Sequence, residues 1–121
     1  MFAYLYLGQA HYSLKGFSDS EQAYLKGLEF ADPTDKTTFQ FIKGLRELYF
    51  TKEAEGEAQD GKLEDLEMKK LRNFERAVHF FHAKGNWPKW VEESVKLADH
   101  YLEIQEGPKA EEIYSSLLLR D

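Results

Sequence analysis

Apolar side chains recur at intervals of three or four residues along most of the chain, which is the spacing of one face of an α-helix. Glycines, prolines and short polar runs divide this pattern into about six stretches. The predicted helices run over about Phe2–Leu14, from Ser18 or Asp19 to Ala31, and over Lys36–Glu55, Leu63–Lys84, Lys89–Gln105 and Lys109–Leu119. No segment alternates apolar and polar residues over the length of a strand. The pattern therefore predicts an all-α fold.

Each predicted helix has an apolar stripe that we expect to face the core. In the first helix this stripe consists of Ala3, Leu7, Ala10 and Leu14. In the fifth helix it consists of Val91, Val95, Ala98 and Leu102. Tyr6 and Tyr12 lie beside the first stripe, so we expect them on a more accessible side of the helix.

Short connections separate most of the predicted helices. We expect Gly16 to end the first helix in the left-handed conformation, and Ser18 or Asp19 to cap the second. Short connections also favour antiparallel neighbours, so the helices form hairpins. The exception is the segment 53–62, EAEGEAQDGK, which is polar and has no apolar anchor. We predict a single domain over 1–121, with this linker as its internal boundary between 1–52 and 63–121.

Two parts of the chain carry a similar order of small residues, glycine turns and tyrosines. They are Leu7-Gly8, Gly16-Phe17 and Ala23-Tyr24 in the first part, and Leu97-Ala98, Gly107 and Ala110 to Tyr114 in the second. The first part resembles the tetratricopeptide repeat, a helix–turn–helix unit of about 34 residues. The matching positions are Tyr4, Leu7, Gly8 and Ala10 in its first helix, Gly16 and Phe17 in its turn, and Tyr24, Gly27, Leu28 and Pro33 in its second helix and end.

This resemblance implies part of a right-handed superhelix of about six antiparallel helices, whose concave surface holds a peptide or protein segment. Members of the family that bind C-terminal carboxylates use a lysine and an asparagine on the first helix. Leu5 and Gln9 occupy those positions here, which argues against that ligand. The partner-binding residues that we predict are Tyr6, Gln9, Tyr12, Lys43 and Arg46. For Lys43 and Arg46, ordinary solvated surface charge is the alternative interpretation. For Tyr6 and Tyr12, the alternative is packing onto a preceding repeat.

Composition narrows the classes of partner. The chain of 121 residues is 42% hydrophobic and 15% aromatic, which is too apolar for a disordered protein. Its formal net charge of −6 argues against a nucleic-acid partner. No apolar run approaches the ~20 residues that span a bilayer, so we expect no membrane partner. The absence of cysteine fits a reducing compartment, the cytoplasm or the nucleus.

Candidate chemistry is sparse. The sequence contains no nucleophile motif, phosphate-binding loop or zinc-protease motif, so we expect a protein that is not an enzyme and has no cofactor. His79 and His82 lie three residues apart on one predicted helix. A metal site there would need His100, Glu75 or Asp99 as a further ligand. We favour histidines that are partly buried in a helix interface and predict no metal site.

Two further clusters have alternative interpretations. Lys69, Lys70, Arg72, Arg76 and Lys84 form a basic run after an acidic segment. We favour a solvated helix with pairs such as Asp65–Lys69 over a docking site for an acidic partner. Trp87 and Trp90 flank Pro88, where packing over the end of a helix pair is favoured over a binding hot spot.

These observations predict a protein–protein interaction module, a scaffold or adaptor that binds a peptide or protein segment. The alternative is a structural segment of a larger helical array or oligomer. In that case the helix ends, with the first helix on one side and Leu117 to Leu119 on the other, would be surfaces for self-association. The first residues already have the pattern of a helix interior without a cap, which suggests a piece of a longer protein.

Overall fold

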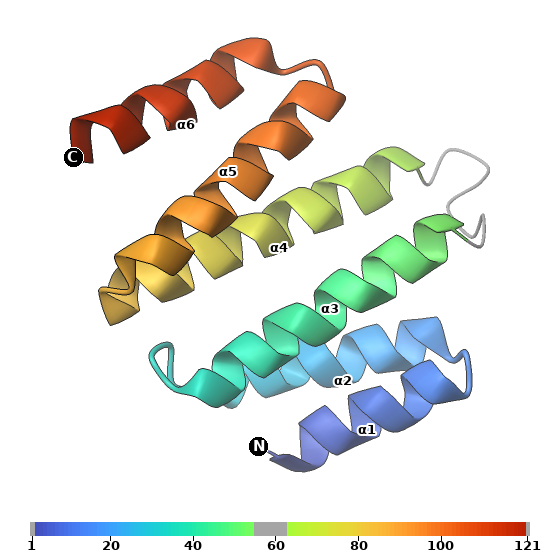
Figure 1. The fold of residues 1–121 in the computed structure, drawn as a ribbon. Helices are drawn as coiled ribbons and strands as arrows, with labels where there is room; N and C mark the ends of the chain where they lie inside the picture. The colour runs from blue at the N-terminus through green and yellow to red at the C-terminus, as the bar shows by residue number, and fades with distance from the viewer. Residues whose placement is uncertain (1, 55–62, 121) are drawn as a thin grey trace. The chain divides into compact units, whose positions relative to one another are not determined.

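The computed structural model describes residues 2–54 and 63–120, and within these ranges the fold is all-α, as predicted (Figure 1). No strand occurs in the described ranges. The helices are α1 (Phe2–Ser13), α2 (Phe17–Phe30), α3 (Lys36–Ala54), α4 (Leu63–Lys84), α5 (Trp87–Glu103) and α6 (Gly107–Arg120). α5 begins two residues before its predicted start, because Asn86 caps it by accepting a hydrogen bond from the Lys89 amide and Pro88 fits the first turn.

The chain divides into two compact units. Unit 1 extends to Asn73 and unit 2 begins at Phe74, so the boundary falls inside α4. The linker predicted at 53–62 begins with Glu53 and Ala54, which belong to the last turn of α3. Its remaining residues lie outside the described ranges.

Three helix ends share one backbone geometry. The φ angle is positive at one residue of each turn: 63° at Lys15, 69° at Gly85 and 63° at Gln105. In each turn, the amide of the next residue donates a hydrogen bond to a carbonyl five residues earlier, which is the Schellman arrangement. These bonds join Gly16 to His11 (2.8 Å), Asn86 to Phe81 (3.0 Å) and Glu106 to Tyr101 (2.7 Å).

The expectations for the first turn were wrong. Gly16 has a φ of −82° and is the N-cap of α2, whereas Lys15 takes the left-handed position. Neither Ser18 nor Asp19 caps α2, since both already belong to its first turn. In a Schellman turn, the residue with positive φ directly precedes the amide that bonds five residues back. That amide belongs to Gly16 here, so Lys15 takes the left-handed conformation.

In unit 1, α1 and α2 form an antiparallel pair, and α3 packs on α2 and on α1 (Figure 1). The centre of this core comes from α3, where five side chains are at most 2% exposed. They are Phe41, Ile42, Leu45, Leu48 and Tyr49. On α2, Ala23, Tyr24 and Gly27 are buried. The expectation that each helix turns an apolar stripe toward the core thus holds for α2 and α3.

The first half of α4 belongs to unit 1, where it adds Leu66 to the hydrophobic core and makes several polar contacts. Asn73 is buried, and its Nδ2 donates to the Ile42 carbonyl at 2.9 Å. Lys69 Nζ reaches Glu21 of α2 at 3.3 Å, and Glu21 also accepts a 2.7 Å hydrogen bond from the Tyr49 hydroxyl. Lys70 bonds to Glu53 of α3. These contacts hold α4 beside α2 and α3 through specific donors and acceptors.

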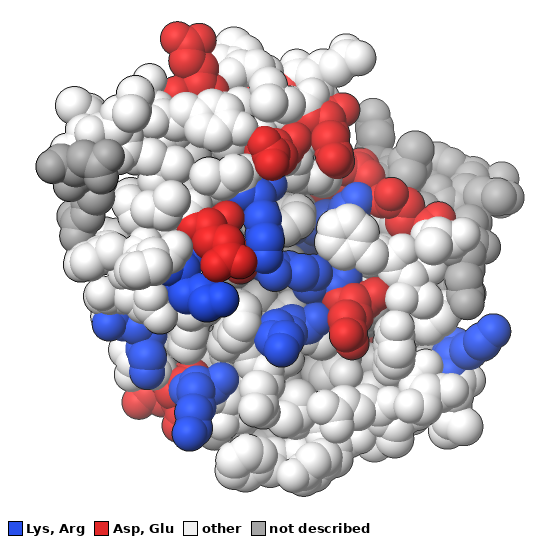
Figure 2. Space-filling model, in the orientation of Figure 1, with Lys and Arg blue, Asp and Glu red and all other residues white. Residues whose placement is uncertain are grey.

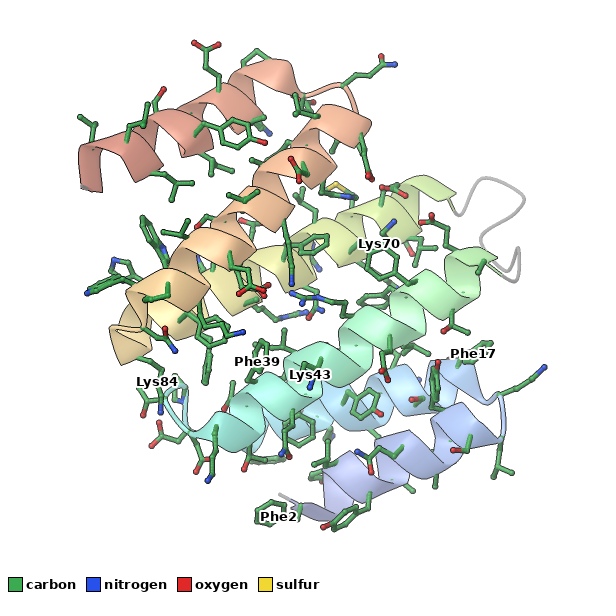
Figure 3. The ribbon with its side chains drawn as sticks, in the orientation of Figure 1. Phe2, Phe17, Phe39, Lys43, Lys70 and Lys84 are labelled. Atoms are coloured by element: carbon green, nitrogen blue, oxygen red, sulfur yellow. The ribbon has the colours of Figure 1, made fainter. Side chains whose placement is uncertain are left out.

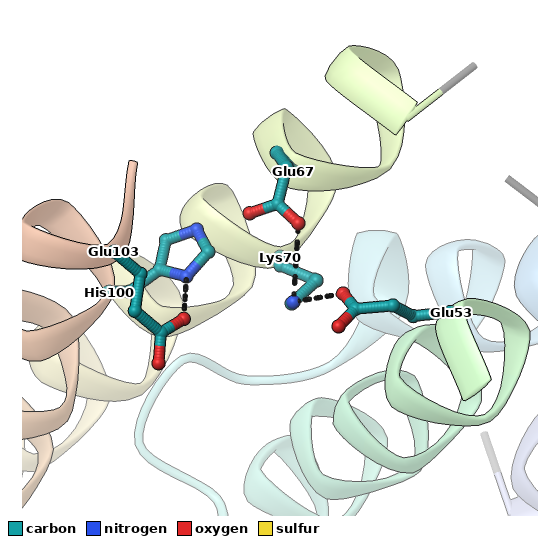
Figure 4. A network of polar contacts seen from close by, with 5 residues as sticks. All are labelled: Glu53, Glu67, Lys70, His100 and Glu103. Atoms are coloured by element: carbon teal, nitrogen blue, oxygen red, sulfur yellow. Dashed lines mark hydrogen bonds and ion pairs between the residues drawn. The ribbon is translucent and has the colours of Figure 1, made fainter. Parts of the chain in front are cut away.

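Lys70 corrects the prediction of a solvated basic helix. It is 5% exposed and forms ion pairs with Glu53 and Glu67 (Figure 4). Its Nζ lies 4.7 Å from the centroid of the Phe50 ring. Two carboxylates and an aromatic face therefore replace the water that the ammonium group loses on burial. The predicted Asp65–Lys69 pair is present, at 3.6 Å.

In unit 2, α5 and α6 form a pair in which Ala98 and Ala110 are almost fully buried. The stripe predicted for α5 was wrong in half of its positions, because Val91 and Leu102 are 41% and 51% exposed, whereas Ala98 is buried and Val95 is half-buried. The side chains that α5 buries include polar ones: Glu93, Ser94 and His100. His100 Nδ1 lies 3.8 Å from a Glu103 oxygen. A dashed line marks this contact in Figure 4.

The stripe predicted for the first helix was also wrong. Leu7 is 48% exposed and Leu14, just beyond α1, is 79% exposed, and Ala3 and Ala10 are exposed as well. α1 instead buries Leu5 and Gly8. Both sides of this helix are apolar, so spacing alone did not identify the side that packs on α2 and α3.

Candidate functional site

Close packing around Tyr24 shapes the surface between α1 and α3. A Cβ at Gly8 would lie 2.5 Å from the Tyr24 ring, and a Cβ at Gly44 would lie 2.7 Å from it. The ring of Tyr24 is therefore enclosed by glycine backbone from both helices. Burial, supported by the negative charge of Glu47, raises the pKa of the Tyr24 hydroxyl above its usual value of 10.0 although Ser20 opposes the shift. The phenol is neutral at physiological pH.

Above Tyr24, a groove runs between α1 and α3. Its volume is about 620 Å³, within the range of ligand-binding clefts. α1 contributes Phe2, Leu5, Tyr6, Gln9, Tyr12 and Ser13, α2 contributes Tyr24, and α3 contributes Gln40, Lys43, Gly44 and Glu47. Figure 3 shows Phe2 at the start of α1 and Lys43 on the neighbouring α3. We call this feature the α1–α3 groove.

Exposed aromatic side chains mark one end of the α1–α3 groove. Phe2 and Tyr6 are 56% and 64% exposed, and they lie one turn apart at the start of α1. At the other end, the Tyr12 hydroxyl forms a 2.8 Å hydrogen bond with Thr51 of α3. This bond joins Tyr12 of α1 to α3, so a hydrogen bond bridges one end of the groove and exposed aromatic side chains lie at the other.

Polar side chains lie along the middle of the groove. Gln9 and Gln40 are both exposed and contribute amides from the two helices. Lys43 is exposed, and within residues 2–54 and 63–120 it has no hydrogen bond or ion pair. Glu47 lies one helical turn beyond Lys43 on the same side of α3. The groove therefore offers apolar surface, amide donors and acceptors, and one charge of each sign.

Four of the five predicted partner-binding residues line this groove: Tyr6, Gln9, Tyr12 and Lys43. Arg46 is not among the lining residues, and its side chain is half-buried on α3. Leu5 is 5% exposed and belongs to both the groove floor and the core. A core side chain thus occupies one of the two carboxylate-binding positions that the family resemblance implies.

Sequence reasoning missed Phe2, Ser13, Gln40 and Glu47. The signal was present, since Phe2, Tyr6, Gln9 and Ser13 repeat at helical spacing on α1. The same holds for Gln40, Lys43 and Glu47 on α3. What the sequence did not show is that these two rows lie side by side, which depends on how Gly8 and Gly44 pack on Tyr24.

The histidines do not assemble a metal site in the described ranges, where no group of three or more suitable ligands occurs. His79 and His82 are exposed, so the expectation that a helix interface partly buries them was wrong. The His82 ring instead lies 5.4 Å from the Trp87 ring and 6.1 Å from the Trp90 ring. The two tryptophans pack on each other at 5.9 Å, as the packing interpretation predicts.

The surface charges favour a solvated arrangement. Figure 2 shows basic and acidic side chains next to one another over α3 and the start of α4. Lys69 illustrates this with its pairs to Glu21 and Asp65. Pairs of this kind compensate part of the positive charge of the basic run at the start of α4. None of the described helices is long and apolar enough to cross a membrane.

In comparisons with known proteins, no protein-family model, no curated protein and no solved structure matches the chain. The resemblance to the tetratricopeptide repeat therefore stays a prediction from the residues quoted above.

Proposed function

We propose that this protein is an interaction module that binds a peptide or protein segment in the α1–α3 groove. The observation that carries the proposal is the open aromatic end formed by Phe2 and Tyr6, next to Lys43, which has no partner among the described residues. Exposed aromatic side chains beside a preformed groove are typical of binding hot spots.

The chemistry of the groove suits a segment of peptide chain. The amides of Gln9 and Gln40 can each donate to a backbone carbonyl and accept from a backbone amide. Phe2 and Tyr6 offer a surface for an apolar side chain. Lys43 can form a charge-assisted hydrogen bond with a carboxylate of the segment. The preferred segment therefore combines an apolar anchor with an acidic residue.

The groove is also prepared for binding before a partner arrives. Tyr12 is held by Thr51, and Tyr24 is fixed between Gly8 and Gly44, so less side-chain freedom is lost on binding. The resemblance to a peptide-binding repeat family supports the same function. With no cysteine in the chain, we expect this adaptor to work in the cytoplasm or nucleus.

Selection from a random peptide library on the immobilised chain, followed by fluorescence anisotropy with a selected peptide, tests the proposal. We expect Tyr6→Ala, Gln9→Ala and Lys43→Ala each to weaken binding by about tenfold or more, as for central contacts of an interface. The matched controls Phe30→Ala, Gln22→Ala and Lys26→Ala replace exposed residues outside the groove and should change binding less than twofold. Equal binding by the groove variants and the wild-type chain would contradict the proposal.

A further inference from the structure

α1 is apolar on two opposite sides, and only one of them is covered. Leu5 and Gly8 face the core of unit 1. The opposite side carries Ala3, Leu7, Ala10 and Leu14, which we call the outer face. A helix that is apolar around its circumference is normally buried on more than one side. In the described ranges α1 packs only on α2 and α3.

The outer face is highly exposed to solvent although its side chains are apolar. Leu7 is 48% exposed and Leu14 is 79% exposed. Beside them, Phe30 is 65% exposed and stacks on Tyr4 with ring centroids 6.0 Å apart, which extends the apolar surface. None of the four residues of this face lines the α1–α3 groove, so it is a separate surface.

We propose that the outer face binds the outer face of a second copy of this chain, with the two α1 helices antiparallel. Charge favours this occupant. The segment 2–14 contains no Asp, Glu, Lys or Arg, although the chain as a whole carries −6. Because an isologous contact places each residue opposite its own neighbours, a charged patch would repel itself. The outer face is free of this repulsion.

The spacing of the outer face is also self-complementary. In an antiparallel pair with its two-fold axis between Gly8 and Gln9, Leu7 of one copy meets Ala10 of the other. Ala3 likewise meets Leu14. Each large side chain then packs beside a small one, as the close packing of helices requires.

Other occupants fit the same face less well. A helix that lies on a membrane surface normally has lysine and arginine along its polar side, and the segment 2–14 contains neither. α1 contains 12 residues, which corresponds to a length of about 18 Å. One such helix per copy covers less than the roughly 800 Å² per partner of a standard interface. The self-association is therefore weak and reversible.

Sedimentation velocity of the full chain over a range of concentrations tests the proposal. We expect a monomer–dimer equilibrium that Leu7→Glu and Leu14→Glu each weaken at least tenfold. Leu118→Glu is the matched control, because Leu118 of α6 is equally apolar and 76% exposed. Its association should equal that of the wild-type chain. A wild-type chain that stays monomeric at millimolar concentration, or association that only Leu118→Glu weakens, overturns the proposal.

The absence of cysteine allows the orientation to be tested by cross-linking. Ala3→Cys and Leu14→Cys, mixed in equal amounts and oxidised, should form the mixed disulfide. Ala3→Cys alone should not, because its two copies would be eleven residues of helix rise apart, about 16 Å. Efficient cross-linking of Ala3→Cys to itself would overturn the antiparallel arrangement. Gln9→Ala should leave association unchanged, which separates this surface from the α1–α3 groove.

Discussion

Backbone conformation at single residues defines the hairpins of this fold. Lys15, Gly85 and Gln105 occupy the same place in three Schellman turns, yet only one of them is glycine. A side chain in the left-handed region costs about 1–2 kcal/mol, because its Cβ approaches the following carbonyl oxygen. Two of the three turns therefore carry local strain that the surrounding helices offset.

Replacing these residues should shift stability in opposite directions. We expect Lys15→Gly to raise the free energy of unfolding by about 0.5–1 kcal/mol, since relief of strain exceeds the entropic cost of glycine. Gly85→Ala should lower it by about 1–2 kcal/mol, although a Cβ at Gly85 would meet no atom within 4 Å. Urea denaturation followed by circular dichroism measures both changes.

Gly107→Ala is the control for this pair. A Cβ there also meets nothing within 4 Å, but Gly107 begins α6 without a positive φ. This variant should be neutral or slightly stabilising. A loss of stability equal to that of Gly85→Ala would show that backbone conformation is not the cause.

At the scale of the helices, the sequence predicted where each helix begins and ends better than it predicted which side of the helix is buried. Lys36 and Leu63 begin α3 and α4 where the periodic pattern places them, since glycine, proline and polar runs mark helix ends locally. The buried side of a helix can be predicted from the sequence only when one face is apolar and the opposite face is polar. α1 lacks this contrast, so Leu7 was assigned to the core, whereas α1 buries Leu5 instead.

Buried polar residues were the other part that the sequence did not reveal. Lys70 and Asn73 look like ordinary residues of a charged helix, and their burial depends on distant partners, Glu53 and the Ile42 carbonyl. The residues that line the groove were also only partly predictable, because they come from two helices that are distant in sequence. Tyr6 and Lys43 were predicted from their own helices, but Gln40 joins them only because α1 and α3 are neighbours.

The contact between α4 and α3 gives a prediction at this scale. Asn73→Ala should lower the free energy of unfolding by about 1–3 kcal/mol, because it removes a buried hydrogen bond and leaves a void. Chemical denaturation measures the loss. Arg72→Ala, at the exposed neighbouring position, should change it by less than about 0.5 kcal/mol. Similar losses in both variants would argue against the role assigned to the Asn73–Ile42 bond.

At the scale of the whole molecule, net charge opposes the self-association that we propose. Two copies together carry twice the formal charge of −6, while the outer face of α1 carries none. Salt screens this repulsion, with a Debye length that falls from about 30 Å at 0.01 M to about 3 Å at 1 M. An apolar contact between like-charged molecules should therefore become tighter as salt increases.

We expect the dissociation constant of the dimer to fall about threefold or more between roughly 20 mM and 500 mM sodium chloride. Sedimentation equilibrium in the two buffers measures the change. Dimers joined by ion pairs would show the reverse, with weaker association at high salt. Leu7→Glu should remain the weaker associator in both buffers.

The packed tryptophans at the start of α5 make the two units optically distinct. Trp87 and Trp90 are the whole tryptophan content of the chain, and both belong to unit 2. Indole emission therefore reports the melting of unit 2, while far-ultraviolet circular dichroism reports the helices of both units. Unit 1, which contains the α1–α3 groove, has no indole of its own, so a tryptophan-labelled peptide would be a direct optical probe of the groove.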